Sequence, residues 1–99
     1  MIFGAVGGVL SLSNSFPEIT MDLYNLLIAK DYEKAIALYD RILQINNVVG
    51  GKGGVSAVKY AMDLHGLVGG YARRPLMPIS DAEKKVIHDK LQAEGLIKE

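Results

Sequence analysis

The feature that most constrains this sequence is a short apolar segment, residues 4–13, that has no counterpart elsewhere in the chain. It is rich in glycine, valine and leucine, and it lacks the alternation of apolar and polar residues that marks a half-exposed strand. A continuous apolar run of this length is typical of a strand that is covered on both faces, as in a parallel sheet. Such a strand needs neighbours on each side, and no second segment of the chain can supply them. The sequence therefore predicts a strand whose sheet lies outside the chain.

The remaining sequence has the period of amphipathic helices. Ser15 and Glu18 have the spacing of a capping box, as do Ser80 and Glu83, and Asp31 can cap another helix. The glycine-rich segment 48–54 breaks the helical pattern. We therefore expect four helices, at about residues 16–30, 31–47, 55–65 and 80–94. The predicted fold class is mainly α, with residues 1–99 forming one unit of an N-terminal strand segment and about four helices.

Composition excludes several classes of function. The chain has 99 residues, no cysteine and a formal net charge of zero, so thiolate metal sites are excluded and neither nucleic acid nor an anionic membrane is indicated as a partner. The apolar residues 1–12 are too few to span a bilayer. They also lack the basic residues that precede the apolar core of a secretion signal. We therefore expect a cytoplasmic protein.

Three groups of residues could carry chemistry, and a structural reading is favoured for each. The loop 50–54 resembles a phosphate cradle but lacks the P-loop spacing, so a flexible turn is favoured. His65 and His88 show no metal-ligand spacing, and surface or capping roles are favoured for both. Arg73 and Arg74 could bind a carboxylate or a phosphate, but a solvated pair that tethers a loop is favoured.

Ser11, Ser13 and Asn14 stand at the end of the predicted strand, immediately before a helix. In a parallel α/β barrel, binding residues collect at this end of each strand. Outside a barrel, the same residues would only terminate a strand and cap a helix. The sequence leaves these two interpretations evenly balanced.

The order of elements resembles the C-terminal third of the dihydrodipicolinate synthase and N-acetylneuraminate lyase family. Residues 4–14 resemble the family's eighth strand and the loop after it, and the two following helices resemble those that come next in the family. The segment 54–66, with Arg73-Arg74-Pro75-Leu76 and Pro78, resembles the family's C-terminal region. The sequence of residues 54–62 most resembles the 2-keto-3-deoxy-sugar-acid and 4-hydroxy-2-oxoglutarate aldolase branches.

This resemblance implies a (β/α)8 barrel and class I aldolase chemistry, in which a strand-borne lysine forms a Schiff base with pyruvate or another 2-oxo acid. That lysine, the family's relay tyrosine and its carboxylate-binding loop have no match here, so we assign no catalytic residue, cofactor or metal ligand. By resemblance, Val9 lies where the strand backbone approaches the Schiff base. Ser11 matches a position that contacts substrate hydroxyls in the lyase branch.

We therefore expect a C-terminal fragment of a Schiff-base-forming lyase or aldolase that is inactive alone. The alternative is a helical self-association or interaction module. The expected partners are further copies of the chain, bound through exposed apolar helix faces, and the missing barrel portion.

Overall fold

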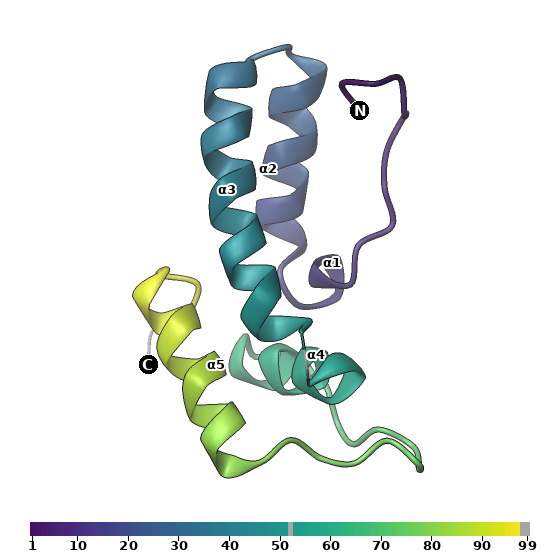
Figure 1. Ribbon diagram of the computed structural model, residues 1–99, viewed down its shortest axis with the longest axis vertical. Helices are drawn as coiled ribbons and strands as arrows, with labels where there is room; N and C mark the ends of the chain where they lie inside the picture. Colours follow the sequence, from purple (N-terminus) through teal and green to yellow (C-terminus); the bar gives the residue numbers. More distant parts are fainter. Residues whose placement is uncertain (52, 98–99) are drawn as a thin grey trace.

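The computed structural model describes residues 1–51 and 53–97 and is mainly helical. The described residues form a short helix α1 (Leu12–Ser15) and four longer ones: α2 (Pro17–Ile28), α3 (Tyr32–Val49), α4 (Gly54–Leu64) and α5 (Asp81–Ala93). Helices α2 and α3 form an antiparallel hairpin, α4 crosses below the C-terminal end of α3, and α5 packs against α3 and α4 (Figure 1). The mainly α prediction is therefore confirmed.

The strand predicted for residues 4–13 does not form, and the described residues contain no strand at all. Residues 1–10, which we call the N-terminal arm, follow an extended path beside α2, and Leu12 and Ser13 already belong to α1 (Figure 1). The physical reason is the one that the sequence indicates. A strand is held by hydrogen bonds to a neighbour, and the described part of the chain offers none.

Local capping signals explain where α3 and α5 begin, but the capping box expected at the start of α2 does not form. Ser80 accepts from the Glu83 amide and Glu83 accepts from the Ser80 amide, which completes the capping box expected for α5. Asp31 caps α3 by accepting from the amide of Lys34. Ser15 does not cap α2, because it closes α1 and its buried hydroxyl donates to the carbonyl of Val58, 3.1 Å away.

Helices α4 and α5 each end just before a glycine. Gly66 and Gly95 have φ values of 88° and 72°, a left-handed conformation that glycine adopts without strain. After each of them, the next amide bonds back to a carbonyl of the preceding helix, from Leu67 to Met62 and from Leu96 to Leu91. These are the stops that the sequence predicts for α4 and α5.

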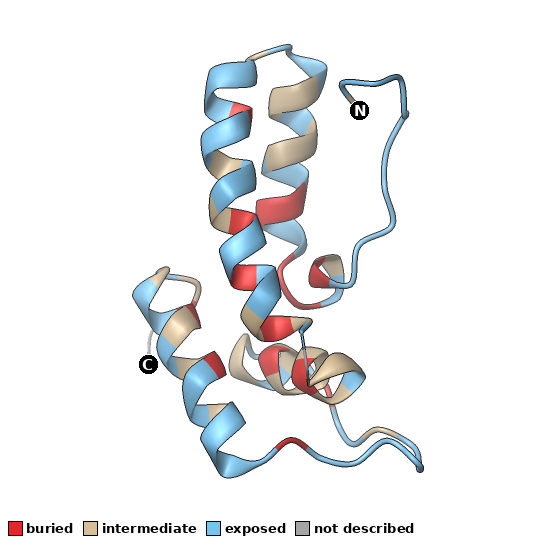
Figure 2. Cartoon of the chain, in the orientation of Figure 1, coloured by how far each residue is buried: buried red, intermediate tan, exposed pale blue. Residues whose placement is uncertain are grey.

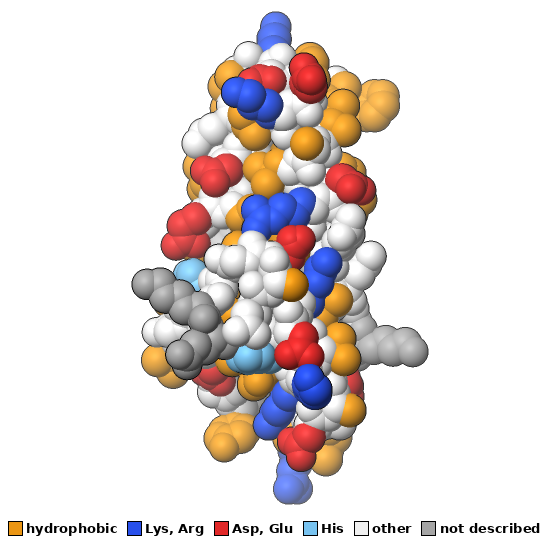
Figure 3. Space-filling view, turned by 90° about the vertical axis from the view of Figure 1, so that its left-hand side faces the viewer, with side chains coloured by type: hydrophobic (Ala, Val, Ile, Leu, Met, Phe, Trp, Pro, Cys, Tyr) orange, Lys and Arg blue, Asp and Glu red, His pale blue; other side chains and the backbone are white. Residues whose placement is uncertain are grey.

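The core lies where the lower halves of the helices meet (Figure 2). Phe16, Ile45, Val49 and Leu91 are among its largest fully buried side chains. By contrast, the upper part of the α2–α3 hairpin and the N-terminal arm keep apolar side chains in solvent. The face shown in Figure 3 likewise exposes hydrophobic side chains between charged ones.

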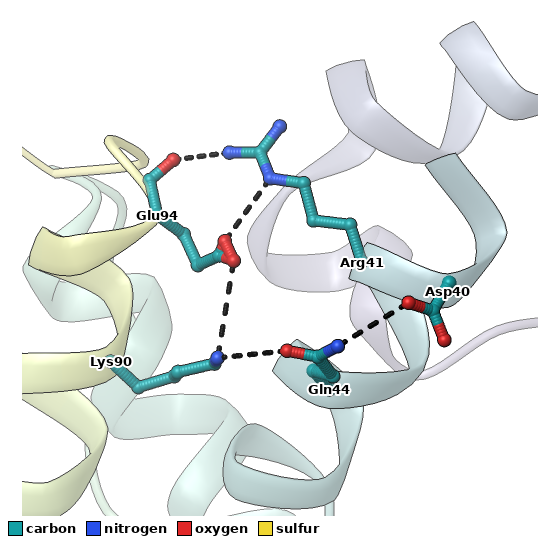
Figure 4. Close-up of polar contacts among 5 residues, drawn as sticks. All are labelled: Asp40, Arg41, Gln44, Lys90 and Glu94. Atoms are coloured by element: carbon teal, nitrogen blue, oxygen red, sulfur yellow. Dashed lines mark hydrogen bonds and ion pairs between the residues drawn. The ribbon is translucent and has the colours of Figure 1, made fainter. Parts of the chain in front are cut away.

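A polar network fastens α5 to α3 (Figure 4). The Arg41 guanidinium lies 3.2 Å from the Glu94 carboxylate and also donates to the Glu94 backbone carbonyl. Lys90 lies 3.9 Å from the Glu94 carboxylate and donates to the side chain of Gln44. Because the Glu94 side chain is only 17% exposed, this contact is less screened than a surface ion pair.

Candidate functional site

Two of the three polar residues at the end of the arm line a hollow. Ser11 and Asn14 face a space of about 430 Å³, and Asn14 also donates to the Ser11 carbonyl. Ser13 does not line this hollow, because its hydroxyl donates to Thr20 in α2. The other lining residues come from the glycine-rich loop and α4; they are Gly50, Gly54, Val55, Val58, Lys59 and Met62.

Of the two residues expected near substrate, only Ser11 reaches this hollow. Val9 lies on the arm with its side chain fully in solvent, and it does not line the space. Leu12, on the other side of Ser11, is buried in the core. The fold therefore fixes the backbone on the helix side of Ser11 and leaves its hydroxyl exposed at the hollow.

A second hollow adjoins the first along the same face of α4. Val55 and Lys59, one helical turn apart, line both of them. The second space is about 420 Å³ and is lined further by Tyr71, Ala72, Arg73, Arg74, Pro75 and Leu76. The fold thus brings the end of the arm, the glycine-rich loop and the two arginines to the same side of α4. Sequence spacing gave no signal of this proximity.

The lysine of the loop 50–54, Lys52, lies outside the described residues. The phosphate hypothesis for this loop stays a prediction. Two of its glycines, Gly50 and Gly54, do line the first hollow.

The histidines are not brought together with any candidate ligand set. His65 packs edge-on against Phe16, with ring centroids 4.7 Å apart, and its Nε2 atom lies 3.8 Å from the Glu18 carboxylate. His88 lies 3.6 Å from the carboxylate of Asp89. No cluster of three potential metal ligands occurs among residues 1–51 and 53–97. The contacts of the two histidines are made to an aromatic ring and to neighbouring carboxylates.

Among the described residues, Asp89 is the group whose pKa the fold clearly shifts. Its carboxylate accepts from the Lys85 ammonium at 2.7 Å, and this hydrogen bond, together with the positive charge of Lys85 and a contact with His88, lowers the pKa of Asp89. Because the side chain lies on the surface of α5, this is local helix electrostatics rather than an acid-base site.

No described lysine has the surroundings of an imine-forming residue. Such a lysine needs a desolvated pocket that favours the neutral amine. Lys59, Lys84 and Lys90 are half-buried, and the other described lysines are exposed. Lys59 donates to the Gly69 carbonyl, and Lys84 lies 5.7 Å from the centre of the Tyr60 ring.

The described residues form a mainly helical fold with two adjoining open hollows beside α4. Comparison with known proteins shows the family to which the chain belongs. The chain matches the dihydrodipicolinate synthetase family over residues 1–94, and it belongs to that family.

Curated relatives agree with this assignment. The chain is 34% identical over 96 residues to the 4-hydroxy-tetrahydrodipicolinate synthase of Bartonella henselae and 36% identical to that of Bartonella bacilliformis, with 97% of this chain covered in each case. It is 31% identical to the synthase of the same name from a Jannaschia species. The chain spans about a third of the length of these relatives, 33% of each Bartonella protein. The resemblance to a sugar-acid aldolase branch stays a prediction.

In the described ranges, no helix combines the length and the hydropathy needed to cross a membrane.

Proposed function

We propose that this chain is the C-terminal part of a Schiff-base-forming lyase or aldolase that acts in the cytoplasm on pyruvate or a related 2-oxo acid. In this proposal, residues 4–13 become the eighth strand of a (β/α)8 barrel once the rest of the barrel is present. The chain alone is inactive, because its described lysines lie on helices and loops. No cofactor is needed, since the protein's own lysine supplies the imine nitrogen.

The observation that carries this proposal is the state of the N-terminal arm. Phe3, Val6 and Val9 are almost fully exposed, and Ile2 and Leu10 are 61% and 46% exposed. The arm runs back along α2 in the opposite direction, so that Met1 and Phe3 lie near Leu27 at the far end of the helix (Figure 1). An extended apolar segment that runs antiparallel to the helix after it has the direction expected of a strand in an α/β unit, and this supports the proposal.

Ser11 takes a defined role in the same proposal. It stands at the carboxyl end of the future strand, where the binding residues of a barrel collect, and its hydroxyl is open to a hollow. We assign it a contact with substrate hydroxyls, and we assign the backbone at Val9 to the wall beside the imine.

Imine trapping tests the proposal. The chain is incubated with pyruvate and borohydride, and covalent adducts are read by intact-mass spectrometry. We expect no stoichiometric adduct on the chain alone. When the chain is mixed with the N-terminal two thirds of the Bartonella henselae relative, we expect an adduct on that fragment. The fragment alone and the heat-denatured mixture are the controls. A stoichiometric adduct on a lysine of this chain would contradict the proposal, as would a mixture that traps nothing while the intact relative does.

A second function, self-association, is favoured by a specific surface. Four apolar side chains on α3 are between 41% and 60% exposed, and we call them the α3 stripe: Tyr32, Ile36, Tyr39 and Leu43. Their spacing of four, three and four residues is that of the seam between two packed helices. A second copy of the chain is the occupant we propose.

A further inference from the structure

We infer that Lys59, Arg73 and Arg74 form a binding site for a small organic dianion, such as a short dicarboxylate or a phosphorylated acid. The inference concerns the second hollow beside α4 and does not depend on imine chemistry. It gives the two arginines a function beyond the solvated pair that the sequence favoured.

Positive charge is concentrated at the second hollow. Lys59, Arg73 and Arg74 all line the same space of about 420 Å³, whose lining includes no aspartate or glutamate. None of the three cations makes an ion pair within the described part of the chain. Since the chain as a whole has equal numbers of acidic and basic residues, this grouping is local and not a result of net charge.

Hydrogen bonds to α4 hold the connection that carries the arginines. Before them, the Gly69 carbonyl accepts from the Lys59 ammonium at 3.0 Å, and the Gly69 amide donates to the Asp63 carboxylate at 2.7 Å. After them, the Met77 carbonyl accepts from the Ser56 hydroxyl at 2.7 Å. The connection between α4 and α5 is therefore fastened to α4 on both sides of the arginine pair.

Within this frame, the arginines stand in a closed turn. The Leu76 amide donates to the Arg73 carbonyl at 3.1 Å, which ties the first residue of the turn to the fourth. A fastened turn loses less conformational entropy on binding than a free loop does. Both guanidinium groups are exposed, so their donors are available to a ligand.

The three cations determine which class of ligand the hollow favours. Guanidinium groups match planar carboxylate and phosphate oxygens through paired hydrogen bonds, and a neighbouring ammonium adds a point charge. Three cations favour a doubly charged ligand over a singly charged one. The walls next to them, Val55, Tyr71 and Leu76, can cover a short carbon skeleton.

Nuclear magnetic resonance tests the inference on the isotope-labelled chain. Inorganic phosphate, succinate and acetate are titrated separately at constant ionic strength and near-neutral pH. We expect saturable amide shifts on residues 55–59 and 69–77 with at least one of the two dianions, and binding of acetate that is about tenfold weaker or more. Saturation by phosphate alone would assign a phosphorylated ligand, and saturation by succinate alone or by both would assign a dicarboxylate or a general dianion site.

Variants decide whether the arginines are responsible. We expect R73A/R74A to weaken binding of the dianion by about tenfold or more, because two charge-assisted contacts are lost. R73K/R74K keeps the charge but not the paired geometry, and it should bind more weakly than the unmodified chain. K34A/K85A removes the same amount of charge from α3 and α5 and should leave the affinity unchanged.

Three results would overturn the inference. They are the absence of saturable shifts with both dianions, equal affinity in R73A/R74A, and an equal loss in K34A/K85A. The helical circular dichroism signal of each variant shows that the fold is retained. If R73A/R74A loses that signal, the affinity of R73K/R74K for the dianion is used instead, and an affinity equal to that of the unmodified chain would overturn the inference.

Discussion

At the scale of single residues, close approach of two backbones limits what the chain can accept. Gly69 is buried, and a Cβ atom added to it would lie 1.9 Å from the carbonyl oxygen of Lys59 in α4. No pair of heavy atoms tolerates that distance without a shift of the backbone. The α4–α5 connection can therefore pass over α4 at this point only because the side chain is absent.

We predict that Gly69→Ala destabilises the chain by about 1–3 kcal/mol, the usual cost of forcing extra atoms into a packed contact. If the connection moves away instead, the hydrogen bonds of Gly69 to Lys59 and Asp63 are lost. Urea denaturation followed by circular dichroism measures the change. Gly7→Ala is the matched control, because no atom lies within 4 Å of its added Cβ, and it should change stability by less than about 0.5 kcal/mol. Equal effects of the two substitutions would contradict the close approach.

At the scale of elements, the position of α5 depends on a contact that is distant in sequence. Arg41 in α3 binds both the side chain and the backbone carbonyl of Glu94, the C-terminal cap of α5 (Figure 4). A cation at this end of a helix also interacts favourably with the helix dipole. The contact therefore fixes the end of α5 against α3.

We predict that Arg41→Ala lowers the free energy of unfolding by about 1 kcal/mol, a value reduced for the 40% exposure of the arginine. Lys34→Ala breaks the pair with Asp31, which is 3.8 Å long and more exposed, and it should cost less than about 0.5 kcal/mol. Urea midpoints of the two variants provide the comparison. A loss in Arg41→Ala that is no larger than the loss in Lys34→Ala would contradict the prediction.

The same scale shows why some elements could be predicted and others could not. The α5 capping box and the stops at Gly66 and Gly95 are local signals, complete within a few residues, and they could be predicted. Ser15 has an equally good local signal, but a hydrogen bond to Val58, 43 residues away, determines its role. The strand predicted for residues 4–13 does not form, because the hydrogen-bond partners that a strand needs are not among the described residues.

The candidate site was predictable only in part. The sequence placed Ser11 near the end of a strand and ahead of a helix from about residue 16, whereas Ser11 precedes the short helix α1 and lies at a hollow. The arginine turn lies close to that hollow only because the α4–α5 connection folds back over α4, beside Lys59. No pattern within the sequence encodes that path.

At the scale of the whole molecule, apolar surface is divided unevenly. The core fills the lower half, while the α3 stripe and the arm stay in solvent. Large exposed apolar patches are typical of surfaces that meet another protein. In the proposed barrel, the missing part would cover the arm, and the α3 stripe would remain for a second copy.

We predict that the chain self-associates with increasing concentration and that Ile36→Glu shifts it toward the monomer, because the charge would have to be buried in the seam. Val86→Glu, on α5, is the control, since Val86 and Ile36 have similar exposures of 58% and 60%. Sedimentation velocity over a range of concentrations measures the effect. A monomer at every concentration would contradict the prediction, as would an equal shift in Val86→Glu.

The unpaired arm also gives the molecule a built-in reporter. Within the described ranges, the amides of residues 5–10 donate to no backbone carbonyl. Their protons should therefore exchange with deuterium almost as fast as those of an unstructured peptide, while the amides inside α3 and α4 exchange slowly. If neighbouring strands arrive, the same six amides become ladder donors and their exchange slows. Exchange at the arm would then register the assembly of the sheet separately from any catalytic event.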